Sequence, residues 1–328
     1  MTILPAAAGP VQYIPLLQGE AVDIDRFAGA EQSDWILSIA HDICDPLLSR
    51  GVLCVQAPNN VWRHIRSPEP LTDTTYLYEL PSTAVVGLCK ISLRDNRSRT
   101  DTTGDAADMR TAVLQRDAST CWITRASDPT GPFLNSHICP KRMGDAQAQH
   151  ILETFCGYQG SNISVFHPMF GITLLRSLEV YFDSYDMGFR RMSPSHQYKV
   201  HAFGPEKLLS IAGMPQIPGY PIPPLHNYIV NNAPTPGHTD NPLPGLFRWH
   251  YLQCVLRQFA THNYRRQPNV LYHEISLPME GDSDDGTDDG DGNDWPSAGW
   301  DRARLAASEA EAERQRQSAV VSCCNEVP

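Results

Sequence analysis

The chain has 328 residues and a mass of 36.5 kDa, and 41% of its residues are hydrophobic. That length and apolar fraction predict one or two domains with a buried core and exclude a wholly disordered chain. No run of eighteen apolar residues occurs, so we expect no membrane-spanning helix. The first fifteen residues lack the basic start and apolar core of a secretory signal, and the nine scattered cysteines form no C-x-x-C pair. We therefore expect an intracellular protein, cytoplasmic or nuclear, with reduced thiols.

The formal net charge of −11 is unevenly distributed. Residues 187–273 carry eight Lys and Arg against two acidic residues, a net charge of +6, whereas residues 280–328 carry a net charge of −9. The basic block would attract a polyanion such as nucleic acid, because binding of this kind depends on local phosphate neutralisation. The alternative is that these residues are the solvated side chains of an ordinary surface. The acidic tail could in turn bind the basic block of its own chain or a basic partner.

In chain order, residues 1–109 predict an N-terminal α/β extension whose role the sequence does not indicate. Apolar residues at helical spacing predict a helix over residues 34–49. Three short apolar runs predict strands, at residues 52–56, 74–80 and 84–93. The polar stretch 94–108 predicts a linker or a long loop.

The C-terminal part begins with ten prolines between residues 203 and 246, which exclude long regular elements there. Residues 246–260 (LFRWHYLQCVLRQFA) then predict an amphipathic helix, and we expect residues 201–273 to pack on the preceding module. Residues 274–328 form an acidic tail. Its stretch 281–294 has no apolar residue and predicts disorder, whereas residues 300–321 predict a short exposed helix.

Three segments between residues 110 and 183 are informative about chemistry. Residues 110–124 (RTAVLQRDASTCWIT) predict a helix, a turn and an extended C-W-I-T. Residues 133–140 (FLNSHICP) predict a short strand that delivers His137 at its end. Residues 170–183 (FGITLLRSLEVYFD) predict a strand followed by a helical turn that carries Glu179 and Asp183. Glycine-rich phosphate loops, G-x-S-x-G elbows and H-E-x-x-H helices do not occur, which argues against the common nucleotide-binding, hydrolase and zincin patterns.

The order of these elements resembles that of the HNH nuclease family, in particular its fungal HNH-domain proteins. In chain order the elements are a helix, a C-x-x-T strand, a strand ending in His, a long excursion, G-I-x-L and a helix ending in F-D. The segment R-W-H-Y-x-x-C-V at residues 248–255 extends the resemblance, which covers roughly residues 110–265. The resemblance implies an α+β fold in which a ββα-metal module at residues 110–200 is embedded in a larger single domain of about residues 10–273.

In that family a histidine on the first strand activates water, and one divalent metal polarises the phosphodiester. The resemblance therefore implies His137 as the catalytic base and Mg²⁺ or Mn²⁺ as the cofactor. The family commonly carries Asn, Asp and His where this chain has Phe170, Ser177 and Glu179. Glu179 would then supply an oxygen ligand to the metal, and His167 is a substitute ligand. Two functions stay open: metal-dependent phosphodiester hydrolysis, or a catalytically inactive interaction or nucleic-acid-binding module.

Basic residues that flank these segments are the candidates for phosphate contacts, namely Lys141, Arg142, Arg190, Arg191 and Arg257. They are equally consistent with ordinary surface charges. Asp183 is more typical of a structural cap, or of a partner for a basic group, than of a metal ligand. His238 and Asp240 suggest an independent metal or acid-base site, whereas His250 on the helix at 246–260 indicates packing.

Overall fold

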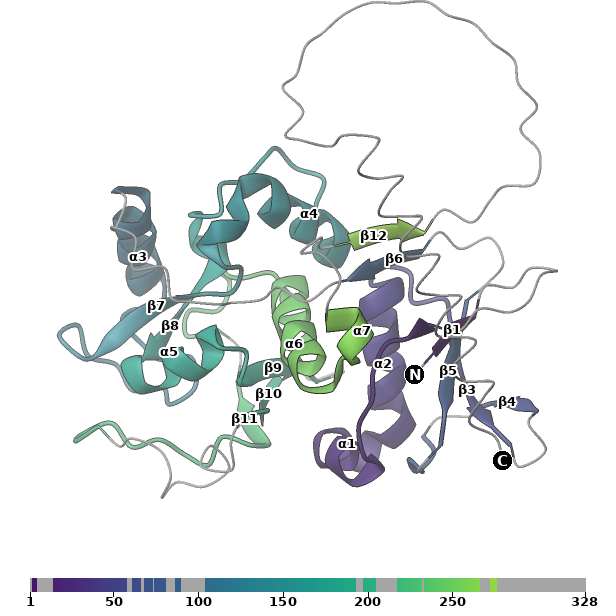
Figure 1. Cartoon of the computed structure of the whole chain (residues 1–328). Helices are drawn as coiled ribbons and strands as arrows, with labels where there is room; N and C mark the ends of the chain where they lie inside the picture. The colour runs from purple at the N-terminus through teal and green to yellow at the C-terminus, as the bar shows by residue number, and fades with distance from the viewer. Residues whose placement is uncertain are drawn as a thin grey trace, which may run out of the picture.

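The computed structural model describes residues 2–4, 14–57, 61–65, 68–72, 74–80, 86–89, 104–192, 197–204, 217–231, 233–265 and 272–275. Helices and small sheets are mixed along this part of the chain, so the fold is α+β, as the sequence predicts (Figure 1). The segment at 281–294 that is expected to be disordered, the helix expected at 300–321 and most of the loop expected at 94–108 lie outside the described residues. None of the helices in the described part is long and apolar enough to cross a bilayer.

Five short strands form the N-terminal sheet, in the order β2-β1-β5-β3-β4. β3 (Val52–Gln56) matches its predicted strand, and β5 (Tyr76–Glu79) lies inside the run predicted at 74–80. β3 pairs antiparallel with β5 on one side and with β4 (Trp62–His64) on the other. The two other strands of this sheet are β1 (Thr2–Leu4) and β2 (Ile14–Pro15).

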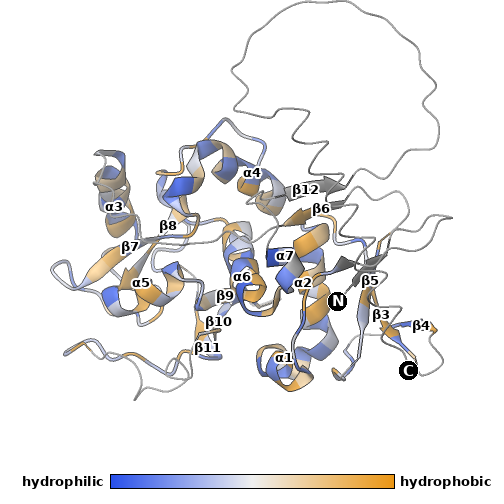
Figure 2. Ribbon diagram, viewed as in Figure 1, coloured by the Kyte–Doolittle hydropathy of each residue, from blue (hydrophilic) through white to orange (hydrophobic). Residues whose placement is uncertain are grey.

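Two helices separate β2 from β3, namely α1 (Ala21–Ala28) and α2 (Gln32–Cys44), joined by the 3-10 turn η1 (Gly29–Glu31). α2 begins close to the predicted start and ends five residues earlier than expected. Its apolar residues Trp35, Ile39 and Ile43 are buried, because their spacing of four places them on one face. Figure 2 shows hydrophobic residues along α2 and α5.

The middle of the chain contains two strands and a helix in direct succession. β7 (Phe133–His137) pairs antiparallel with β8 (Gly171–Leu175), and α5 (Arg176–Asp183) begins at the residue after β8. α3 (Gly104–Arg116) contacts both strands. The long excursion between the strands contains the 3-10 turn η2 (Lys141–Met143), α4 (Gly144–Cys156) and the 3-10 turn η3 (Pro168–Phe170).

Two local predictions in this region are wrong. Residues 104–108, expected in a loop, form the first turn of α3, because Met109 and Val113 anchor the helix in the core. The C-W-I-T at 121–124 is a turn rather than a strand. The Arg125 amide donates to the Cys121 carbonyl at 3.0 Å, and this reversal directs the Trp122 indole into the core.

The C-terminal elements supply the central helix of the core. β9 (Met187–Arg191), β10 (Tyr198–Ala202) and β11 (Tyr228–Val230) form an antiparallel sheet, and α6 (Pro244–Phe259) packs on β9, α4 and α2. Every residue from Trp249 to Leu256 is buried, so α6 is enclosed rather than amphipathic (Figure 1). Beyond it lie α7 (His262–Arg265) and β12 (Tyr272–Ile275), which pairs with β6 (Val86–Cys89).

Polar contacts join the N-terminal helices to these C-terminal elements. Trp35 Nε1 donates to the Tyr251 hydroxyl at 2.8 Å, so α2 is tied to α6. Arg190 of β9 pairs with Glu31, and Arg248 of α6 pairs with Asp42. Buried residues of α2, β9 and α6 belong to one hydrophobic cluster. The part of residues 1–109 that forms α1 and α2 therefore shares its core with the C-terminal elements.

The buried pair Asp42–Arg248 predicts a pH-dependent stability. Burial raises the pKa of Asp42 to about 6 although Arg248 lowers it. Because this pKa lies above the ordinary value of 3.8, the contribution of Asp42 is fully present below about pH 4 and is lost as the pH rises through 6. We expect Arg248→Met to lower the free energy of unfolding by about 3 kcal/mol at pH 8, where a charged Asp42 loses its cation, and by less at pH 5. Urea denaturation at both pH values measures the difference.

The control is Arg63→Met, since the Arg63–Glu69 pair lies at the surface. This variant should lose less than about 1 kcal/mol at either pH. A loss in Arg248→Met that is the same at pH 5 and pH 8 would contradict the role given to Asp42.

Candidate functional site

The strand pair β7–β8 places His137 at its end. His137 lies opposite Gly171, and the next amide, that of Ile138, donates to the Phe170 carbonyl at 2.7 Å. His137 is half-buried, and its ring stands edge-on to that of Phe166, with 6.3 Å between the centroids. The predicted position of His137 at a strand end is thus confirmed, and its backbone is fixed on both sides.

Helix α5 packs against β7 on the face of Ser136. The buried Ser136 hydroxyl donates to Asp183 Oδ1 at 3.3 Å, so the end of the helix lies beside the residue that precedes His137. Side chains alternate between the two faces of a strand, and His137 therefore belongs to the opposite face from Ser136. That second face is the one covered by α3.

The geometry at Gly171 identifies the face of α3 independently. A Cβ atom on Gly171 would lie 2.3 Å from Asn135 Oδ1, 2.9 Å from the Met109 side chain and 3.0 Å from that of Val113. Gly171 and His137 are directly paired, so their Cα–Cβ directions share a face. His137 is therefore directed to the α3 side, whereas Glu179 stands on α5, one helical turn before Asp183. The backbone of β7 thus directs His137 to the α3 side, and Glu179 belongs to the helix that packs on the Ser136 side.

Phe170 occupies the position of the asparagine in the HNH pattern. Its side chain is fully buried, and its carbonyl accepts the Ile138 amide. The loop before β8 is thus held by a backbone hydrogen bond and by hydrophobic packing. A side-chain amide is not needed to hold this loop.

His167, the substitute ligand, lies in a different polar group. It caps η3 by accepting the Met169 amide at its Nδ1, and its Nε2 lies 4.0 Å from Asp240 Oδ1. The Asp240 amide donates to His238 Nδ1 at 3.2 Å. His167 therefore approaches the H-x-D segment at 238–240. The side chains of His167 and Asp240 are both more than one-third exposed, so their contact is weak.

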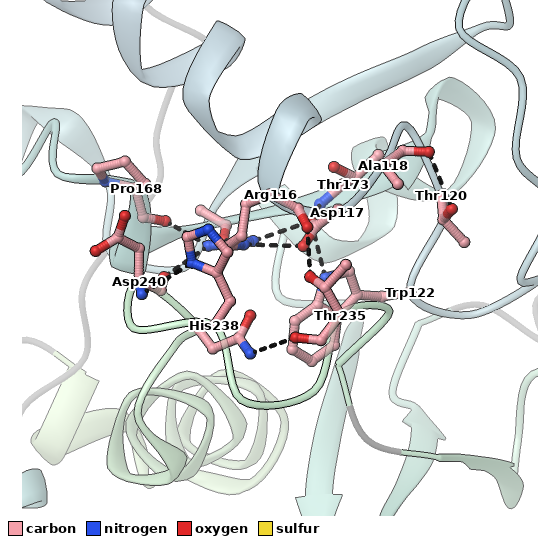
Figure 3. A network of polar contacts seen from close by, with 12 residues as sticks. Arg116, Asp117, Ala118, Thr120, Trp122, Pro168, Thr173, Thr235, His238 and Asp240 are labelled. Carbon is pink, nitrogen blue, oxygen red and sulfur yellow. Dashed lines mark hydrogen bonds and ion pairs between the residues drawn. The ribbon is translucent and has the colours of Figure 1, made fainter.

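The buried residues Arg116 and Asp117 connect the end of α3 to η3, to β8 and to the loop before α6 (Figure 3). Asp117 accepts Arg116 Nε and Nη2, the Trp122 indole and the Thr173 amide, each at 2.9 Å. Both side chains are at most 1% exposed. The remaining guanidinium hydrogens go to three backbone carbonyls, those of Pro168, Gly171 and Asp240. This network could not be predicted from the sequence, where its only signal is an Arg-Asp pair at the end of a predicted helix.

Two of the five basic candidates bind acceptors of the protein itself. Arg190 pairs with Glu31. Arg257 donates to the Ser184 carbonyl and lies 3.8 Å from Asp186. These arginines hold neighbouring elements together, which leaves less of their charge for a phosphate.

Of the other three candidates, Arg142 and Arg191 are exposed and Lys141 is half-buried. Lys141 and Arg142 form η2 just after β7, and Arg191 ends β9 with an exposed side chain. Lys141 and Arg142 are the candidates next to the His137 strand.

Among the described residues, one group of three side chains has metal-ligating atoms within 4.8 Å of one another, and it consists of Cys54, His64 and Glu79. It lies in the N-terminal sheet and contains neither His137, His167 nor Glu179. Comparisons of the chain with protein-family models, with curated proteins and with solved structures gave no match. The resemblance to HNH nucleases therefore stands on this chain's own residues.

Replacing Asp117 tests whether the buried network holds this region together. Asp117→Asn leaves the Arg116 guanidinium buried without a compensating charge, so we expect a loss of about 3–5 kcal/mol in the free energy of unfolding. The thermal midpoint should fall by roughly 10 °C. Asp108→Asn, on the exposed side of α3, the helix that ends at Arg116, should change stability by no more than about 0.5 kcal/mol. Equal midpoints for the two variants would remove the network from its central role.

Proposed function

We propose that this chain is a nuclease-derived protein of the HNH type, in which the ββα-metal module serves as a scaffold for binding and no longer hydrolyses phosphodiesters. The observation that carries the proposal is the alternation along β7, where Ser136 bonds Asp183 of α5 and His137 belongs to the other face. Hydrolysis needs the base and the metal within reach of one phosphate and its attacking water. A base and a ligand on opposite faces do not meet this requirement.

The replaced motif positions support the same conclusion. Phe170 fills the site of the motif asparagine with a buried ring. Glu179 stands where the family's helix carries its metal-binding histidine. The enclosed ring of Phe170 and the backbone hydrogen bond that holds the loop before β8 are features of a packed scaffold.

Active hydrolysis with Mg²⁺ or Mn²⁺ is the second candidate, and one observation favours it. Glu179 and Asp183 are four residues apart on α5, so their carboxylates are neighbours on the helix surface. Two carboxylates suit a hard cation, and the Ser136–Asp183 contact would bring such a cation to the residue beside His137. In this alternative, His137 reaches the phosphate past the end of β7.

A plasmid-nicking assay separates the two candidates. The full chain, His137→Ala and Glu179→Gln are purified in parallel and incubated with supercoiled DNA and Mg²⁺ or Mn²⁺. We expect the same low level of nicking in all three, with or without a chelator. Metal-dependent nicking by the wild-type chain that both variants lose would overturn the scaffold proposal and establish the nuclease.

The binding partner that the basic candidates favour is nucleic acid, contacted through Lys141 and Arg142. Their removal should lower the slope of log affinity against log salt by about 2, because each phosphate contact releases a condensed counterion. Fluorescence anisotropy with a labelled DNA duplex at several salt concentrations measures this slope for Lys141→Ala/Arg142→Ala. The control is Arg26→Ala, an exposed arginine of α1. No binding at low salt, or the same slope in both variants, would refute the nucleic-acid role.

A further inference from the structure

Three side chains of different chemistry meet on one face of the N-terminal sheet. Cys54 of β3 pairs directly with His64 of β4. Glu79 of β5 pairs with Val52, two residues before Cys54, so Glu79 lies diagonally next to Cys54 on the same face. Residues 54, 64 and 79 are distant in the sequence, and the register of three strands brings them together.

The distances between these atoms match those of ligands around a tetrahedral zinc ion. His64 Nε2 lies 3.2 Å from Glu79 Oε2, and Cys54 Sγ lies 3.6 Å from the same oxygen. Bonds of about 2.3 Å to sulfur and about 2.0 Å to nitrogen and oxygen place nitrogen and oxygen about 3.3 Å apart, and sulfur and oxygen about 3.5 Å apart. The third distance, from sulfur to nitrogen, is within 4.8 Å. The cluster therefore needs only small movements to enclose a cation.

The burial of the three groups is graded from the core to the solvent. Cys54 is fully buried, whereas the side chains of His64 and Glu79 are 68% and 42% exposed. A cation held by them would have the thiolate behind it and an open position toward water. Three protein ligands with an open fourth position is the arrangement of zinc sites that keep a bound water.

The donor set selects the kind of cation. A divalent ion would bind Cys54 as a thiolate, release the thiol proton to water, and be neutralised by the thiolate together with the Glu79 carboxylate. Thiolate and imidazole ligands select zinc over magnesium, which prefers oxygen.

The geometry points to a zinc-binding site formed by Cys54, His64 and Glu79, with a water molecule as the fourth ligand. This site ties β3, β4 and β5 together at one end of the N-terminal sheet. It shares no residue with β7, β8 or α5, so the zinc site and the function proposed above are tested independently.

Cobalt substitution tests the site, because Co²⁺ accepts the same ligands and its spectrum reports them. The full chain is reduced, freed of metal with a chelator and titrated with Co²⁺. We expect a near-ultraviolet charge-transfer band from a thiolate and intense visible bands of a four-coordinate ion. One equivalent of Zn²⁺ should then abolish these bands.

The variants locate the metal. Cys54→Ser should abolish the charge-transfer band, and His64→Gln and Glu79→Gln should each weaken zinc binding by at least about tenfold in competition with a chromophoric chelator. The matched controls are Cys156→Ser, a half-buried cysteine of α4, and His262→Gln, an exposed histidine of α7, and both should bind as the wild-type chain does. Circular dichroism checks that each variant is folded.

Two results would overturn the inference. One is the lack of a charge-transfer band in the wild-type chain at saturating Co²⁺. The other is a band that persists in Cys54→Ser, which would assign the metal to another thiol. Should Cys54→Ser fail to fold, the exposed variants His64→Gln and Glu79→Gln decide the matter, since unchanged zinc affinity in both contradicts the site.

Discussion

The hydrogen bonds of one buried arginine determine how the middle of this protein is assembled. A guanidinium has five N–H donors, and in Arg116 all five have acceptors: both oxygens of Asp117 and the carbonyls of Pro168, Gly171 and Asp240. A buried ion pair stabilises a fold only when its remaining hydrogen bonds are satisfied, and here they are. The three carbonyls belong to η3, to the start of β8 and to the loop before α6, so one side chain fixes the relative positions of segments up to 124 residues apart.

Two hydrogen bonds that hold the same region together do not involve the side chains at positions 170 and 179. The Thr173 amide donates to Asp117, which positions the middle of β8, and the Ile138 amide donates to the Phe170 carbonyl, which closes the end of the strand pair. Both contacts use the backbone of β8 or of its preceding loop, and neither depends on the side chain at position 170 or 179.

The parts of the fold that the sequence predicted depend on local periodicity. The helical spacing of Trp35, Ile39 and Ile43 predicted α2, and short apolar runs predicted β3, β7 and β8. Local periodicity does not predict which face of a sheet a side chain occupies, or which distant residues it contacts. A shift of one residue moves a side chain to the other side of a strand, so the order of His137 and Glu179 along the chain does not say whether they meet. The Cys54–His64–Glu79 cluster depends on the register of three strands, one of which, β4, was not predicted, and the partners of Arg116 lie far away in sequence.

The charge pattern along the sequence likewise does not show which charged side chains face solvent. A block with a net charge of +6 predicts a surface for polyanions only if its cations face solvent. In the described part of the chain, Arg190 and Arg248 pair with Glu31 and Asp42 from the acidic N-terminal part, and Arg265 donates to backbone carbonyls of α6 and the residue after it. The opposite charges of the basic block and the acidic N-terminal part thus form ion pairs inside the protein, which hold α2 and η1 against α6 and β9. Under the proposed nucleic-acid role, phosphate recognition would involve Lys141 and Arg142 of η2, of which Arg142 is exposed. They follow β7 directly, at the end of the strand that carries His137.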